Sequence, residues 1–183
     1  VEILYVGTQK GLESDIVPKA GYDLETITVN YLRRKISFHN IKSGAMLLKG
    51  LWQARNIIKK FEPNIVIGTG GFVCGPVVFM ASKMGIRTII HEQNVFPGIT
   101  NRILGKYVDK IAISFEEASK YFKQKNKLIV TGNPIRQEFF SVSTEEAKTK
   151  YKTQKDKSLV LIVGGSGGSI HINKVVNNMM IKY

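Results

Sequence analysis

The chain has 183 residues, enough for one domain with a sizeable core or for one domain and part of another. Hydrophobic residues make up 43% and charged residues 22%, which excludes a disordered chain. The net charge of +13 predicts an anionic partner, whether nucleic acid, a phosphorylated ligand or an acidic membrane surface. Cys74 is the only cysteine, so no internal disulfide forms and a reducing compartment is expected. No stretch approaches the roughly 18 apolar residues of a membrane-spanning helix, and Val1 need not be the natural N-terminus.

Short runs of β-branched residues alternate with stretches of helical spacing along the chain. The predicted strands are Glu2–Gly7, Leu24–Val29, Asn64–Thr69, Arg87–Glu92, Lys110–Ser114, Lys127–Gly132 and Ser158–Gly165. Most of them are continuously apolar, as in parallel strands that are buried on both faces. Helical spacing is clear over Ser43–Phe61 and Gly75–Met84. This alternation predicts an α/β fold with a Rossmann-like, doubly wound parallel sheet, whose ligands bind beyond the carboxyl ends of the strands.

A change in composition over Ser141–Ser158 predicts a domain boundary. This stretch is polar and rich in lysine, and Ser143 with Glu146 has the spacing of a capping box at the start of a short helix. We therefore expect one domain over residues 1–150 and the start of a second domain over residues 151–183.

The sequence HEQN, residues His91–Asn94, follows directly on a predicted buried strand. In a doubly wound sheet this is the edge at which ligands bind, so the four polar side chains are candidates for a binding site. The alternative is that they cap the next helix and face water.

Two glycine-rich segments also follow predicted strands, GTGGFVCGP at Gly68–Pro76 and the stretch Ile162–Lys174. Glycines allow close approach of the backbone to a ligand, and the amides at a helix start attract anions. Neither segment is a dinucleotide fingerprint, because Val73 and Ile170 stand where the third glycine is needed, and neither has the Gly-Lys-Ser/Thr of a Walker loop. A tight strand-to-helix turn is the alternative for the first segment.

The other candidates for chemistry are weak by themselves. Arg136, in the sequence GNPIR, could bind a phosphate or a carboxylate, but a surface arginine is unremarkable. The histidines are scattered without the spacing of a zinc site. Cys74 lies beside a glycine loop, yet a buried structural cysteine is the stronger interpretation.

The helical segment Ile41–Phe61 carries two apolar stripes. One is the expected core face, formed by Leu47, Leu51, Ala54, Ile58 and Phe61. The second is formed by Ile41, Ala45, Leu48 and Trp52 and is bordered by lysines and arginines. An apolar surface with basic neighbours predicts a helix that lies on an anionic bilayer, and packing of both stripes inside the protein is the alternative.

Taken together, GTGGFVCGP, HEQN with PGITN, GNPIR and GGSGGS occur in an order and spacing that resembles the MurG family. These are bacterial peptidoglycan N-acetylglucosaminyltransferases with a two-domain GT-B fold, and the resemblance covers nearly the whole chain. It implies inverting, metal-independent transfer of N-acetylglucosamine from UDP-GlcNAc to undecaprenyl-pyrophosphoryl-MurNAc-pentapeptide (lipid I), which gives lipid II. It also implies no cofactor, and a peripheral position on the cytoplasmic face of the cell membrane.

The resemblance also assigns roles by motif. Asn94, Arg136 and Ser166 would bind the donor UDP-GlcNAc, and Gly70, Gly71, His91, Glu92 and Gln93 would line the acceptor side of the cleft. Ile41, Leu48, Leu51 and Trp52 would form the membrane patch.

The chain departs from the family pattern at both ends. The family begins with a strand and a glycine-rich loop whose histidine is the usual candidate for the general base, and this chain starts at what matches the second strand. The uridine pocket of the C-terminal domain also lies beyond Tyr183. We therefore expect a GT-B N-terminal domain without its first strand, followed by the first strand and helix of the C-terminal domain, and no transferase activity from this chain alone.

Two other function classes remain open from the sequence. Another GT-B-like sugar-nucleotide enzyme, such as an epimerase, shares the fold, but HEQN and the basic apolar helix argue against it. A nucleic-acid-binding module would need a continuous basic face with interleaved aromatic residues. Most aromatics fall at predicted core positions, so no nucleic-acid partner is expected.

Overall fold

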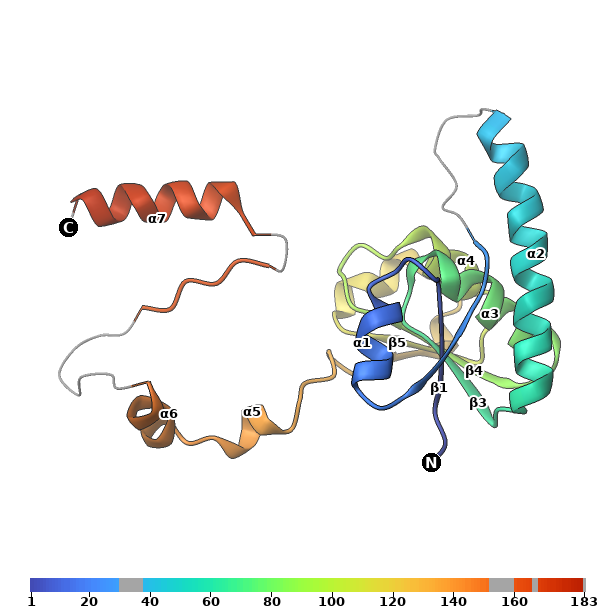
Figure 1. The fold of residues 1–183 in the computed structure, drawn as a ribbon, viewed down its shortest axis with the longest axis horizontal. Helices are drawn as coiled ribbons and strands as arrows, with labels where there is room; N and C mark the ends of the chain where they lie inside the picture. The colour runs from blue at the N-terminus through green and yellow to red at the C-terminus, as the bar shows by residue number, and fades with distance from the viewer. Residues whose placement is uncertain (30–37, 152–159, 166–167, 183) are drawn as a thin grey trace. The chain divides into compact units, whose positions relative to one another are not determined.

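In the part of the chain that the computed structural model describes, short strands form two parallel sheets, of two and four strands. Figure 1 shows them with the helices that connect them. The structure describes residues 1–29, 38–151, 160–165 and 168–182, with side chains at these positions except 38–45 and 182. The chain divides into two compact units, Val1–Pro134 and Ile135–Tyr183, which are described separately.

The first unit contains both sheets. One pairs β1 (Leu4–Gly7) with β2 (Asp23–Thr26), and the other has the order β3-β4-β5-β6. The strands of the second sheet are β3 (Ile65–Gly68), β4 (Arg87–Glu92), β5 (Lys110–Ile113) and β6 (Leu128–Val130). All pairs are parallel, and the register places His91 opposite Ala112 and Glu92 opposite Ile113. The predicted parallel α/β architecture is confirmed.

Helices connect the parallel strands. They are α1 (Glu13–Lys19), α2 (Phe38–Phe61), α3 (Gly71–Lys83) and α4 (Ile99–Leu104), and two short 3₁₀ turns, η1 (Glu116–Tyr121) and η2 (Lys125–Lys127), precede β6. Helices α2 and α3 pack side by side (Figure 1). Because α3 is apolar on almost all sides, it can pack against α2 and the sheet at the same time.

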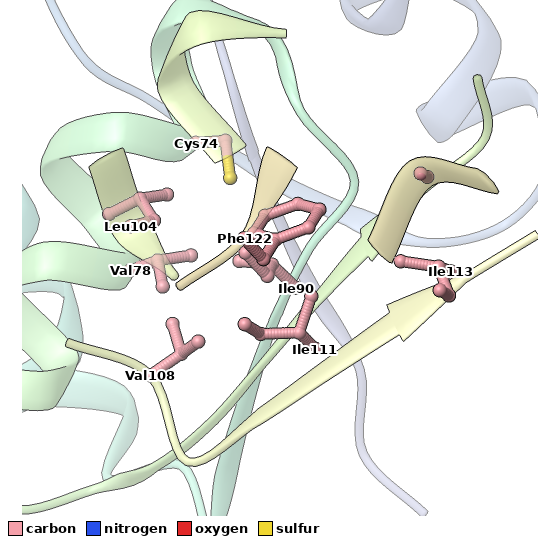
Figure 2. Packing of buried hydrophobic residues seen from close by; sticks show 9 residues of the cluster. Cys74, Val78, Ile90, Leu104, Val108, Ile111, Ile113 and Phe122 are labelled. Atoms are coloured by element: carbon pink, nitrogen blue, oxygen red, sulfur yellow. The ribbon is translucent and has the colours of Figure 1, made fainter. Parts of the chain in front are cut away.

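One apolar cluster fixes the second sheet to its helices (Figure 2). Ile90 of β4 and Ile111 of β5 meet Val78 of α3, Leu104 of α4 and Phe122, which follows η1. All five side chains are almost completely buried. This packing holds the carboxyl end of β4, where HEQN lies, in a rigid frame.

A second cluster joins the two sheets. Ala54 and Val77, from α2 and α3, contact Ile27 just after β2. Val6 of β1 and Val66 of β3 pack against the same cluster. The two helices therefore hold both sheets on one shared apolar surface.

A cavity of about 540 Å³ lies between β1 and β3 and is bounded by α2 and α3. Consecutive residues of both strands line it, Val1–Val6 on one side and Ile65–Gly70 on the other, so it lies along their backbone edges. Among the described residues, β1 pairs only with β2 and β3 only with β4. Within the described ranges, the cavity thus lies between the unpaired edges of β1 and β3.

Helix α2 has one buried and one exposed apolar face. Ala54 and Ile58 are buried, whereas Leu48 is 70% and Trp52 is 64% exposed. Leu51 is half-buried between the two faces, and Leu47, expected in the core, is 40% exposed. Ile41 lies in the same helix at a position whose side chain is outside the described residues. Leu48 and Trp52 are therefore not packed inside the first unit.

The second unit contains α5 (Glu138–Ser141), α6 (Thr144–Lys150) and α7 (Ile170–Lys182). The predicted capping box is confirmed, because Ser143 Oγ accepts from the Glu146 amide while the Glu146 carboxylate accepts from the Ser143 amide. The strand predicted over Ser158–Gly165 is wrong for its described part, since residues 160–165 form no strand. A strand needs a neighbouring strand for its backbone hydrogen bonds, and the described part of this unit offers none.

Candidate functional site

A pocket of about 250 Å³ lies where β3 and β4 end. Gly70 and Gly71 line one side of it, and Glu92, Gln93 and Asn94 line the other. These are five of the residues that the sequence singled out, and the fold brings them together at the edge of the sheet where ligands bind.

The glycine side of the pocket is the amino end of α3. Gly70 caps this helix with φ 96° and ψ −168°, and Gly71 follows with φ 78°, a backbone that side-chain-bearing residues rarely adopt. The first amides of a helix have no partner within the helix, and the helix dipole adds partial positive charge there. This side of the pocket is therefore suited to an anionic group.

The opposite side is organised by the carboxylate of Glu92. Its Oε1 accepts from the backbone amide of Asn94 at 3.0 Å and from Asn94 Nδ2 at 2.9 Å. Its Oε2 accepts from the backbone amide of Gly98 and from Asn101 Nδ2, both at 3.0 Å. Burial by itself raises the pKa of Glu92, but these hydrogen bonds outweigh it and hold the pKa below its ordinary value. Glu92 is therefore a buried carboxylate that stays ionised.

Asn101 completes this arrangement from the first turns of α4. It is 1% exposed, and its Nδ2 also donates to the backbone carbonyl of His91 at 3.1 Å. Its Oδ1 has no partner within the part of the chain that the structure describes. Because both contacts of Nδ2 are with acceptors, the orientation of the Asn101 amide is fixed.

His91 is a link between strands. Its Nε2 lies 3.0 Å from the carbonyl oxygen of Gly132, and its Nδ1 lies 3.1 Å from Nε2 of Gln93. A carbonyl only accepts, so Nε2 carries the proton, and the neutral Nδ1 accepts from the Gln93 amide. His91 is buried and does not line the pocket.

Gln93 ties the site to a third segment. Its Nε2 also lies 3.2 Å from the carbonyl oxygen of Thr69, just before Gly70. HEQN therefore bonds to the glycine loop through Gln93, to the loop after β6 through His91, and to α4 through Glu92. Three segments that the sequence treated as separate motifs are parts of one hydrogen-bond network.

Two of the predicted donor-site residues cannot be placed at this pocket. Arg136 belongs to the second unit and is exposed, and Ser166 falls outside the described residues. Asn133, close to Arg136 in the sequence, belongs to the first unit, where its Oδ1 accepts from Ser114 Oγ at 2.6 Å.

Sequence reasoning missed Asn101, although PGITN was noted as a motif. A usable signal was present, because Asn101, Leu104 and Val108 have the spacing of one helix face. A polar residue on an otherwise buried face needs an internal partner, which here is the buried carboxylate of Glu92.

The other chemical alternatives gain no support. Cys74 is buried, and burial raises the pKa of its thiol, which disfavours the reactive thiolate. In the described ranges, no three histidine, cysteine, aspartate or glutamate residues come together as a metal site would need. The described helices include none that is both long and apolar enough to cross a bilayer.

Comparison with known families identifies the first unit. A model described as the glycosyltransferase family 28 N-terminal domain matches residues 1–113. The chain belongs to this family. Its parallel α/β fold agrees with the GT-B architecture expected from the sequence.

Two curated relatives of this family 28 chain carry the name UDP-N-acetylglucosamine--N-acetylmuramyl-(pentapeptide) pyrophosphoryl-undecaprenol N-acetylglucosamine transferase. The protein of that name from Alkaliphilus oremlandii (strain OhILAs) is 65% identical over 182 residues, which cover 100% of this chain and 50% of the relative. The protein from Acetivibrio thermocellus is 50% identical over 182 residues, with 100% and 49% covered. The family 28 chain thus spans about half the length of the curated relatives it matches.

Solved structures agree on the fold. MurG of Acinetobacter baumannii is 26% identical, with a TM-score of 0.57 over 74% of this chain and 38% of that one. A UDP-GlcNAc 2-epimerase from Neisseria meningitidis bound to UDP-GlcNAc has a TM-score of 0.61 at 13% identity, over 100% of this chain and 54% of that one. The second likeness shows a shared fold and nothing about activity.

Proposed function

We propose that this chain forms the acceptor- and membrane-binding part of a hexosyltransferase of peptidoglycan synthesis. The whole enzyme would move N-acetylglucosamine from UDP-GlcNAc to lipid I. The observation that carries the proposal is the pocket between the amino end of α3 and HEQN, in a family 28 chain whose curated relatives bear this activity in their name. The acceptor domain is proposed to span residues 1–150, and residues 151–183 to begin the nucleotide-binding domain.

The proposed reaction is an inverting displacement without a metal. A hydroxyl oxygen of the acceptor sugar attacks the anomeric carbon of the donor, and the bond from that carbon to the UDP oxygen breaks. The hydroxyl proton passes to a general base, and the bonding electrons leave with UDP. Negative charge grows on the diphosphate, so the site needs hydrogen-bond donors that are already in place.

The described residues supply part of this machinery. The amino end of α3, which begins at Gly71, suits the pyrophosphate of the lipid acceptor. Asn94 is proposed to bind the donor sugar, and Arg136 and Ser166 the nucleotide and its diphosphate. His91 is a poor general base, because both of its ring nitrogens are engaged within the protein. No described residue is assigned that role.

The second proposed partner is the anionic surface of the inner membrane. Leu48 and Trp52 project from α2 as exposed apolar side chains, with the exposed Lys49 and Arg55 on the same helix. Insertion of the apolar side chains and attraction of the bases to anionic lipids would hold the enzyme on the cytoplasmic face, where lipid I is presented.

The test is a transfer assay with the chain extended to the length of its relatives and with the 183-residue chain alone. The extended enzyme should move labelled N-acetylglucosamine to a lipid I analogue, and the 183-residue chain should not. Asn94→Ala and Arg136→Ala should each lower kcat/KM by at least about tenfold, as expected for loss of one hydrogen bond to a charged or polar substrate group. Glu117→Gln, an exposed position outside the pocket, is the matched control.

Two outcomes would count against the proposal. If the extended enzyme folds but transfers no sugar, the proposed transferase activity is wrong. If both Asn94→Ala and Arg136→Ala transfer sugar at the full rate, the proposed activity stands and the assignment of these residues to the donor site is wrong.

A further inference from the structure

Asn101 donates both of its side-chain amide hydrogens to the protein itself, and Asn94 donates one. Asn94 Nδ2 donates to Glu92 Oε1, and Asn101 Nδ2 donates to Glu92 Oε2 and to the His91 carbonyl. A carboxylate and a carbonyl can only accept, so neither amide group can be turned around without losing these bonds.

The carbonyl oxygen remains on Asn101, and the carbonyl oxygen together with the second Nδ2 hydrogen remains on Asn94. Asn101 Oδ1 is buried without a partner in the described part of the chain, and Asn94 bonds to Glu92 there through its two nitrogens. Asn94 is exposed at the mouth of the pocket. An oxygen in this position binds a ligand group that carries hydrogen.

The two sides of the pocket therefore differ in hydrogen-bonding character, because the HEQN side offers an acceptor oxygen. The amino end of α3, which begins at Gly71, offers backbone donors, and the HEQN side offers the amide oxygen of Asn94. A phosphate supplies only acceptors at neutral pH and suits the α3 side. Sugar hydroxyls and an acetamido N–H supply donors and suit the side that Glu92 organises.

We propose that Glu92 is a positioning residue, which fixes the Asn94 amide so that its oxygen accepts a hydrogen bond from a hydroxyl or acetamido group of the donor sugar. This rests on the proposed function for the identity of the sugar. The positioning itself is a property of the chain and can be tested without any substrate.

The first test measures backbone hydrogen exchange by NMR in the 183-residue protein. The amides of Asn94 and Gly98 donate to opposite oxygens of Glu92. In Glu92→Gln only one of these positions remains an acceptor, so at least one of the two amides should exchange at least about tenfold faster. Wild-type exchange at both amides in a folded Glu92→Gln protein would overturn the positioning role.

The second test separates binding from turnover in the extended enzyme. Glu92→Gln should raise the KM for UDP-GlcNAc at least about tenfold, with a smaller change in the KM for the lipid acceptor. A general loss of structure would instead lower kcat and affect both substrates. Glu117→Gln is the control, and an unchanged donor KM in a folded Glu92→Gln enzyme would overturn the proposal.

A rescue experiment separates the loss of positioning from other damage in Glu92→Gln. Asn94→Asp keeps an oxygen toward the ligand but sets two carboxylates together, so it should also raise the donor KM. In the double variant Glu92→Gln with Asn94→Asp, the glutamine amide introduced at position 92 can donate to the carboxylate introduced at position 94. The double variant should have a lower donor KM than either single variant, a coupling that independent effects would not give. A donor KM equal to the product of the two single effects would overturn the proposal.

The outcomes distinguish this inference from the proposed function. If the wild-type extended enzyme transfers sugar but Glu92→Gln keeps its donor KM, the inference fails and the function stands. If the wild-type enzyme transfers no sugar, the proposed function fails, and the exchange experiment still decides whether Glu92 holds the loop.

Discussion

Glu92 shows what a buried charge requires in this fold. Only 2% of its surface is exposed, and ionised carboxylates are rarely buried so completely without a cation. Here four N–H donors replace water, two of them from the backbone of the loop that Glu92 shapes. The Glu92 charge and the conformation of the loop therefore depend on each other. If either is displaced, the carboxylate loses its donors and the loop amides lose their acceptor.

This dependence predicts how stability changes with pH. The folded protein holds the pKa of Glu92 below its ordinary value, so in that pH range the unfolded chain binds more protons. The contribution of ionised Glu92 to the free energy of unfolding is complete above about pH 5. It is lost as the pH falls through the pKa of Glu92 in the folded protein, which lies below the ordinary glutamate value of about 4.3. Urea unfolding of the 183-residue protein across this range should show the loss.

Glu92→Gln isolates this contribution from those of Asp109 and Glu13, whose pKa values are lowered by hydrogen bonds from Thr88 and Thr8. At neutral pH we expect Glu92→Gln to lower the free energy of unfolding by about 1.5–3 kcal/mol. The difference from wild type should shrink in acid, where Glu92 becomes neutral. A difference that stays constant with pH would contradict this account.

Gly68 is a glycine for reasons of space. A methyl group added there would overlap Cys74 Sγ and lie 2.7 Å from Val78 Cγ2, both in the core that holds β4. Gly68→Ala should therefore lower the free energy of unfolding by about 1–3 kcal/mol, measured by urea denaturation. Gly98→Ala is the matched control, because a methyl group at Gly98 meets nothing within 4 Å and the backbone there is ordinary. Equal stability of the two variants would show that the surrounding side chains can move to accommodate a methyl group at position 68.

At the scale of single elements, α2 differs from an ordinary surface helix. Ala54 belongs to the apolar cluster that joins the two sheets, and Ile58, one turn further on, is also buried, so the helix is anchored along that face. Leu48 and Trp52 are exposed on the same helix, so their side chains are not buried by the fold of the first unit. Large exposed apolar side chains beside basic residues are typical of a surface that meets another phase or partner.

Trp52→Glu tests the membrane surface directly. Binding of the 183-residue protein to vesicles of phosphatidylglycerol and phosphatidylethanolamine, measured by sedimentation, should weaken at least about tenfold. Vesicles of phosphatidylcholine should bind the wild-type protein poorly, because they do not attract its positive charge.

The control separates the lost apolar surface from the added charge. Asn56→Glu places the same charge at an exposed position one turn along α2 and removes no apolar group. It should weaken binding much less than Trp52→Glu does. Equal binding of wild type and Trp52→Glu would exclude this face of α2 from the membrane contact.

The sequence predicted those elements whose patterns are local. The strand Arg87–Glu92 has the predicted bounds, and the capping box at Ser143 forms as expected. Helix α3 begins at Gly71 rather than Gly75, because the unusual backbone at Gly70 ends the preceding turn before the apolar pattern starts. Residues 160–165 read as a strand from composition alone, but a strand also needs a partner, which composition does not reveal.

The site was predictable in position and less so in its internal bonding. The sequence predicted that HEQN follows a buried strand, at the edge of the sheet where ligands bind, and the pocket lies at that edge. The inward contacts of His91 with Gly132 and of Glu92 with Asn101 join residues up to 41 positions apart. The pair of His91 and Gly132 depends on how the strands are ordered in the sheet, so no local pattern could have indicated it, whereas Asn101 had the local signal of a polar residue on a buried helix face.

At the scale of the whole molecule, helices α2 and α3 hold the two sheets of the first unit together. The two sheets share no strand pairing among the described residues, and the cluster of Ala54, Val77 and Ile27 connects them instead. In the second unit, the described side chains include none that is buried. Its helices therefore gain little from the hydrophobic effect within this chain, whereas the first unit has a core of its own.

The cavity between β1 and β3 has a consequence for the protein in solution. Unpaired parallel edges present rows of N–H and C=O groups, and extended segments of other molecules can pair with them. Here two such edges stand on either side of apolar walls from α2 and α3. An extended apolar segment lying in this gap would form backbone hydrogen bonds on both sides at once, so we expect the gap to bind such a segment.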